Sequence, residues 1–146
     1  MKQIHLPLTD EIIGELTAGE SVLLSGSIIT GRDCAHKRIA EYLDRGEKPP
    51  FSFRGETIYY AGPCPAPEGK ACGSCGPTTS ARMDSYAPRL LDLGLKGMIG
   101  KGERSEEVQE AIVRNHAVYF AAIGGAGALY GNAIKESELV AFPDLL

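Results

Sequence analysis

Short apolar runs alternate with amphipathic helical patterns along this chain, and this alternation limits the folds that it can adopt. The apolar runs predict strands because they are short and end at glycine, proline or polar residues. The predicted strands are residues 21–30, 57–61, 97–100, 117–123 and 139–142. The predicted helices are a short one capped by Thr9-Asp10, residues 33–43, one from about residue 77, and one that begins at Ser105. Elements in this order predict an α/β layered sandwich with a partly parallel sheet, in one domain over residues 1–146.

The composition excludes several classes of partner. Hydrophobic residues make up 43% and charged residues 23% of the chain, as in ordinary globular proteins. A net charge of −4 argues against nucleic acid or an anionic membrane as the main partner. No apolar run approaches the roughly 20 residues that span a bilayer, and residues 1–8 lack the apolar core of a signal peptide. We therefore expect a cytoplasmic protein that binds neither nucleic acid nor membrane.

Two cationic residues follow predicted strands directly. Arg32 lies between a strand and a helix, where open α/β sheets bind ligands at the carboxyl ends of their strands. Lys101 follows the predicted strand 97–100 and is flanked by glycines, whose bare backbone lets a small anion approach. The plain alternative is that Asp33 caps the helix, Arg32 is solvated, and Lys101 belongs to an ordinary turn.

A hydroxyl and a guanidinium lie near a third predicted ligand site. Gly76-Pro77 predicts a helix N-terminus, and such an end binds anions through its free N–H groups. Thr78 and Arg82 are four residues apart, so a helix starting there places them on one face. That pair suits a carboxylate or a phosphate, although a capped surface helix with a solvated arginine fits the pattern too. We expect these two side chains to converge with the other cations at one edge of the sheet.

The four cysteines leave several functions open. Cys72-x-x-Cys75 has the spacing of a metal or redox site. Cys64, together with Cys34 or a histidine, would complete the four ligands of a zinc site. The chain could then be a small redox protein or a non-catalytic module that binds anions or metals, and loop thiols without a catalytic role are a further alternative. The glycines at 124–127 do not match the dinucleotide-binding fingerprint.

Taken together, these segments resemble the C-terminal domain, or separate β subunit, of class I fumarases and L-tartrate dehydratases. The shared motifs occur in the family's order and cover most of the chain, from about residue 20 to 142. They are Gly31-Arg32-Asp33 with residues 35–38, Gly76-Pro77-Thr78-Thr79 with residues 82–84, residues 97–102 and residues 124–126. The cysteines of the loop before residue 76 are not part of that pattern.

The resemblance implies a swivelling β/α/β domain in a hydro-lyase that reversibly adds water to a small dicarboxylate, with fumarate and malate ranked ahead of tartrate. It implies that Arg32, Arg82 and Lys101 bind substrate carboxylates and that Thr78 is a candidate catalytic hydroxyl. The larger partner, an α subunit or N-terminal domain, would hold a [4Fe–4S] cluster, so that this chain itself would not hold it. An α2β2-type assembly follows from the same resemblance, and the chain alone is expected to be inactive.

Overall fold

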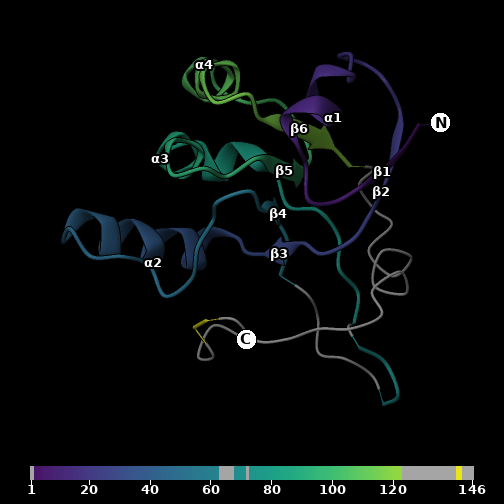
Figure 1. The fold of residues 1–146 in the computed structure, drawn as a ribbon. Coiled ribbons are helices and arrows are strands. Elements are labelled where there is room, and N and C mark those ends of the chain that lie inside the picture. Colours follow the sequence, from purple (N-terminus) through teal and green to yellow (C-terminus); the bar gives the residue numbers. More distant parts are fainter. Residues whose placement is uncertain (1, 63–67, 72, 123–140, 143–146) are drawn as a thin grey trace.

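A four-stranded parallel sheet forms the centre of the computed structural model (Figure 1), which describes residues 2–62, 68–71, 73–122 and 141–142. Its strands, in spatial order, are β3 (Ile29–Thr30), β4 (Thr57–Tyr59), β5 (Gly97–Gly100) and β6 (Val118–Ala121). Neighbours pair in parallel, with Thr30 opposite Tyr59 and Tyr59 opposite Ile99. The carboxyl ends of all four strands therefore lie along one edge of the sheet.

Three helices cover one face of this sheet. They are α2 (Asp33–Asp44), α3 (Ala87–Asp92) and α4 (Glu106–Arg114), on the left of Figure 1. Ile58 and Met98 occupy one register row and pack toward the helices. The helices supply Ile39, Leu90 and Val108, each almost fully buried, to the same core. Burial of side chains of this size against an apolar layer stabilises by about 1.5–3 kcal/mol each.

A smaller β layer covers part of the other face. Strands β1 (Lys2–His5) and β2 (Val22–Ser25) form a parallel pair, and α1 (Asp10–Gly14) packs beside them. Leu6 and its neighbours pack there against Phe120 of the central sheet. The order of layers is thus helices, parallel sheet and smaller sheet, which confirms the predicted α/β layered class. No helix in the described ranges is long and apolar enough to cross a membrane.

The predicted strand at residues 21–30 is two strands, in two different sheets. The chain breaks at Gly26, whose φ is 113°. A side chain there would place its Cβ 2.8 Å from the Leu6 carbonyl oxygen, so glycine is needed for both conformation and space. The strand Lys2–His5 was not predicted from the sequence, and the predicted strand 139–142 lies mostly outside the described residues.

The segment after Pro77 also differs from the prediction of a continuous helix. Thr79 is bridged to Lys101 in parallel, and helical structure starts only with the short 3-10 turn η1 (Ser80–Met83). The Thr78 N–H donates to the Tyr60 carbonyl at 2.6 Å, so this part of the backbone pairs with strand ends instead of with itself. The prediction that Thr78 and Arg82 share a helical face is therefore wrong.

Gly100 allows η1 to approach the sheet closely. The first prediction is that replacing this glycine destabilises the fold. A Cβ there would overlap Ser80 Oγ and lie 2.8 Å from a Tyr60 ring carbon. We expect Gly100→Ala to lower the free energy of unfolding by about 1–3 kcal/mol, the usual cost of overpacking, in a urea titration. Gly14→Ala is the matched control, because nothing lies within 4 Å of its added Cβ. Equal stability of the two variants would contradict this account.

Candidate functional site

The carboxyl edge of the central sheet brings three of the four predicted site residues onto adjacent strand ends. Arg32 follows β3, and Lys101 follows β5 directly. Thr78 lies between them in space, because its N–H donates to the Tyr60 carbonyl just beyond β4. Its own carbonyl accepts from the Lys101 N–H at 3.3 Å. The sequence separates these residues widely, and the parallel register brings their backbones to one level.

Arg32 reaches from the end of β3 toward the end of β4. It is the N-cap residue of α2, and its exposed guanidinium lies directly over Gly62. A Cβ at position 62 would overlap that guanidinium, so the close approach requires glycine. Asp33 is the first helical residue and not the cap.

The backbone of Arg32 is held by a buried histidine. The Arg32 carbonyl accepts from both the His36 N–H, at 3.0 Å, and His36 Nδ1, at 2.9 Å. A carbonyl can only accept, so Nδ1 carries the proton of the imidazole. Burial lowers the pKa of His36, against smaller raising effects from the Arg32 carbonyl and Asp33. His36 is thus a neutral support for the start of α2.

Arg82 reaches the same edge through an ion pair with Asp33. Its Nε and Nη2 both donate to Asp33 Oδ2, at 2.8 and 2.7 Å, and the Arg82 side chain is 56% exposed. The pair joins η1 to the first turn of α2. Nη1 bonds none of the described residues, and the second N–H of Nη2 is not assigned to Asp33 either. The structure thus connects Arg82 to Arg32 through the neighbouring Asp33.

The remaining functional groups of the edge are not engaged by the described residues. Within the described ranges, no hydrogen bond or ion pair occupies the guanidinium of Arg32, the hydroxyl of Thr78 or the ammonium of Lys101. Lys101 is exposed and Thr78 is half-buried. This edge can therefore offer cations and one hydroxyl to an anion with more than one carboxylate.

The cysteines do not form a metal site within the described part of the chain. Cys34 is exposed on α2, and Cys75 is buried. Cys64 and Cys72 lie outside the described residues, so the predicted site of Cys64, Cys72 and Cys75 stays a prediction. Among the residues that the structure does describe, no three His, Cys, Asp or Glu side chains gather closely enough to hold a metal ion.

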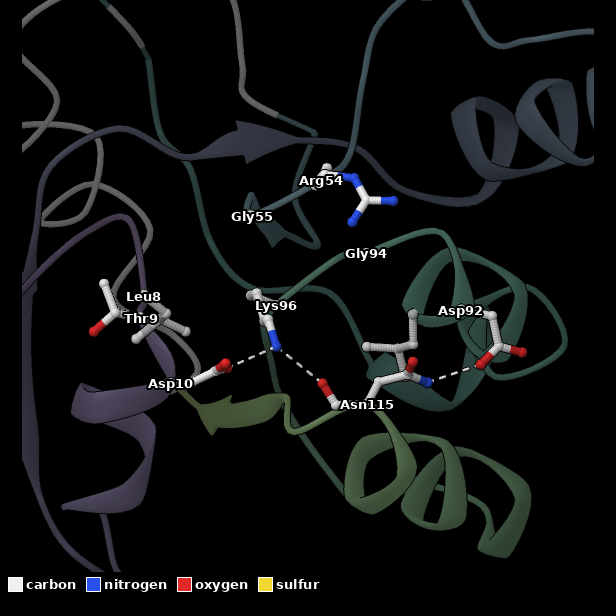
Figure 2. A pocket seen from close by; sticks show the side chains of 10 residues that line it. Leu8, Thr9, Asp10, Arg54, Gly55, Asp92, Gly94, Lys96 and Asn115 are labelled. Carbon is white, nitrogen blue, oxygen red and sulfur yellow. Dashed lines mark hydrogen bonds and ion pairs between the residues drawn. The ribbon is translucent and has the colours of Figure 1, made fainter.

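A cavity of about 410 Å³ lies elsewhere, at the amino ends of the strands (Figure 2). Lys96 projects into it and donates to Asp10 Oδ1 and to the Asn115 carbonyl, each at 3.1 Å. Asp92, on its rim, binds Arg114 and Asn115. Lys96 and Asp92 are thus engaged by opposite charges at this cavity, whereas Arg54, which also lines it, has no ion pair among the described residues.

Sequence reasoning missed a buried ion pair behind the edge. The Arg104 side chain is 2% exposed and donates through Nε to Asp84 Oδ1 at 2.8 Å. Its Nη2 donates to the Tyr60 hydroxyl at 3.1 Å. The letters Gly-Glu-Arg-Ser carry no signal of burial, because arginine is exposed in most proteins. The hydrophobic pattern of the sequence would therefore have placed Arg104 on the surface.

Comparison with known proteins identifies the family of this chain. The model of the family described as Fumarase C-terminus matches residues 1–146. The aerobic class I fumarate hydratase of Salmonella typhimurium is 46% identical over 124 residues, which are 84% of this chain and 21% of that protein. Fumarate hydratase 2 of Leishmania major is 40% identical over 135 residues, or 91% of this chain and 24% of the relative. A Methanocaldococcus jannaschii protein, named after the beta subunit of L(+)-tartrate dehydratase, is 38% identical over 142 residues, which are 95% of this chain and 73% of that protein.

The chain therefore belongs to the Fumarase C-terminus family. It spans about a fifth to a quarter of the two fumarate hydratases, and most of the beta-subunit relative.

The buried imidazole of His36 gives the second prediction, a pH dependence of stability. The folded pKa is lowered, so below the ordinary value of 6.5 the unfolded chain takes up a proton that the folded chain refuses. The contribution of His36 is complete above pH 6.5 and is lost as the pH falls from there toward the lower folded pKa. We expect the free energy of unfolding to fall by up to about 1.4 kcal/mol per pH unit in that range.

Denaturant titrations between pH 7.5 and 5 measure this slope. His36→Gln should flatten it, whereas His5→Gln should leave it unchanged, because His5 is exposed. The account is wrong if His36→Gln retains the slope of the wild type.

Proposed function

We propose that this chain is the β half of a hydro-lyase that reversibly hydrates a small dicarboxylate, with fumarate and malate ahead of tartrate. The observation that carries the proposal is the row of Arg32, Thr78 and Lys101 at the ends of adjacent parallel strands, with their functional groups unengaged by the described residues. A dicarboxylate brings two negative charges to this edge. The family membership and the names of the relatives support the same reaction class.

The three cations would hold the two substrate carboxylates. Arg32 and Arg82 offer planar forks that match a carboxylate through two hydrogen bonds. Lys101 offers a compact charge beside bare glycine backbone. In this proposal the Asp33 carboxylate orients the Arg82 guanidinium, and the remaining N–H groups of that guanidinium are available to the substrate.

Thr78 would act beside the reacting carbons. A free hydroxyl is a poor base, so Thr78 would position the substrate or pass a proton to a stronger base. Its backbone is fixed on both sides, by Tyr60 and by Lys101, which limits the movement of the hydroxyl. That fixation supports positioning as the main part of its role.

The cofactor in this proposal is a [4Fe–4S] cluster held by an α subunit or N-terminal domain. The described part of this chain does not fit a cluster, since no three suitable ligands gather there. When bound to the partner, the cluster would supply a Lewis acid for the substrate oxygen. The name of the beta-subunit relative supports a complementary partner, and we propose an α2β2-type assembly.

The third prediction is that the isolated chain has no hydro-lyase activity. The edge residues supply charge and a hydroxyl, and none of them supplies the Lewis acid. Absorbance of the conjugated double bond of fumarate measures turnover of the iron-free chain alone and after anaerobic assembly with its partner. Activity should appear only in the assembly, and turnover by the pure chain would contradict the proposal.

The fourth prediction concerns Arg82. A lysine ammonium cannot form paired hydrogen bonds with Asp33 and with a substrate carboxylate at the same time. Arg82→Lys should therefore cost about 1.5–3 kcal/mol of transition-state stabilisation. That is roughly 10- to 100-fold in kcat/KM of the assembled enzyme. Steady-state kinetics with matched melting temperatures measures the loss.

Arg89→Lys is the matched control for Arg82→Lys. Arg89 is similarly exposed and pairs with Asp44 at 2.9 Å, outside the carboxyl edge. This variant should keep its activity. Activity of Arg82→Lys within twofold of the wild type would remove Arg82 from the site. Binding of dicarboxylates by the assembly without any turnover would instead indicate a non-catalytic anion-binding module.

A further inference from the structure

A buried polar cluster lies directly behind the carboxyl edge, and Arg104 is its centre. Besides Asp84 and Tyr60, the guanidinium contacts Met98 Sδ, which accepts from Nη1 at 3.4 Å. It also lies over two aromatic rings, 5.1 Å from the centre of Tyr60 and 4.9 Å from that of Tyr119. One cation thus contacts the residue just beyond β4, strands β5 and β6, and the turn after η1.

Each partner of Arg104 belongs to a segment that carries a candidate site residue. Tyr60 binds Arg104 through its hydroxyl, while its main-chain carbonyl holds the Thr78 N–H. Asp84 comes directly after η1, two residues beyond Arg82. Its second oxygen accepts from the Ser105 N–H at 2.8 Å, which fixes η1 to the start of α4. The same ion pair therefore anchors the segments of Thr78 and Arg82.

The cluster extends to the segment of Lys101 through Tyr119. The Tyr119 hydroxyl donates to the Gly102 carbonyl at 2.8 Å. It also bonds Ser80 Oγ at 2.8 Å, and the Ser80 N–H donates to the Lys101 carbonyl. The Tyr119 ring lies against Arg104. Through Tyr119, the guanidinium therefore supports Ser80 and Gly102, the two residues that hold the backbone around Lys101.

An ion pair between the buried Arg104 and the partly buried Asp84 is a poor choice for stability alone. Removing two charges from water costs several kcal/mol per ion, and apolar residues of similar volume often fill such a space equally well. A guanidinium offers instead five N–H donors in a fixed plane. Arg104 uses its Nε, Nη1 and Nη2 on three separate segments, which sets the distances between those segments as an apolar side chain could not.

We propose that Arg104 and Asp84 are positioning residues, which align the segments of Thr78, Arg82 and Lys101 for the substrate. This inference rests on the proposed function for its catalytic consequence. The alignment itself is a property of the folded chain and can be measured without any turnover.

The test uses Arg104→Lys and Tyr60→Phe in the assembled protein. Lysine keeps the charge but cannot make the three directed contacts, and phenylalanine removes only the hydroxyl bonded by Arg104. Arg114→Lys is the control, because that arginine pairs with Asp92 on the surface. If Arg104→Lys does not fold, Tyr60→Phe decides the matter.

Amide hydrogen exchange reports on the alignment. The N–H groups of Thr78, Ser80 and Lys101 all donate across the segments that Arg104 connects. We expect their exchange to accelerate about tenfold or more in both variants, as for local opening. The N–H of Leu6, which donates to Ser25 in the smaller sheet, should be unchanged.

Kinetics reports on the consequence for substrate. Misplacement by about 1 Å can cost up to 100-fold in rate, so we expect kcat/KM to fall at least about tenfold, with most of the loss in kcat. The Arg114→Lys control should stay within twofold.

Accelerated exchange with unchanged kinetics would overturn the positioning role, and so would unchanged exchange. A wild-type assembly without hydro-lyase activity would refute the proposed function instead, while the exchange data would still decide the alignment.

Discussion

The pairing of residues 78–80 with the ends of β4 and β5 is the contact on which the candidate site depends. Three main-chain hydrogen bonds make it, from Thr78 to Tyr60, from Lys101 to Thr78 and from Ser80 to Lys101. They extend the sheet beyond its regular strands and replace the first turn of a helix. Without them, the hydroxyl and the lysine would belong to separate loops, and loops position groups less accurately than a sheet.

The sequence predicted several helices and caps well because these features are locally encoded, whereas the smaller sheet with β1 was not predicted. The helix 33–43 and the caps at Thr9 and Ser105 are confirmed, since helical spacing and capping side chains are short-range signals. The start of the helix after Pro77 was wrong, because the Tyr60 carbonyl that captures the Thr78 N–H lies 18 positions earlier in the chain. No local pattern contains that information.

The residues of the candidate site could be named before their geometry was known, but their support could not. Glycines beside Arg32 and Lys101 are visible in the sequence as places where a ligand can approach the backbone. His36 and Arg104 are polar residues that the fold buries, and Asp84 lies partly buried beside Arg104. Long-range burial of polar groups is the property that hydrophobic patterning reports least well.

The exposure of the cations bears on why such an edge would need a partner. Two unit charges 4 Å apart attract by about 1 kcal/mol in water and by about 4 kcal/mol at the effective dielectric constant of a protein surface. Arg32 and Lys101 are exposed in this chain, so their attraction for a carboxylate is screened here. A partner that covered the edge would exclude water and strengthen each contact severalfold. The substrate would then bind strongly only to the assembly and weakly to either half alone. In the proposed assembly this edge would be half of a site, in which the chain would provide aligned charges and the covering surface would provide the low dielectric that makes them effective.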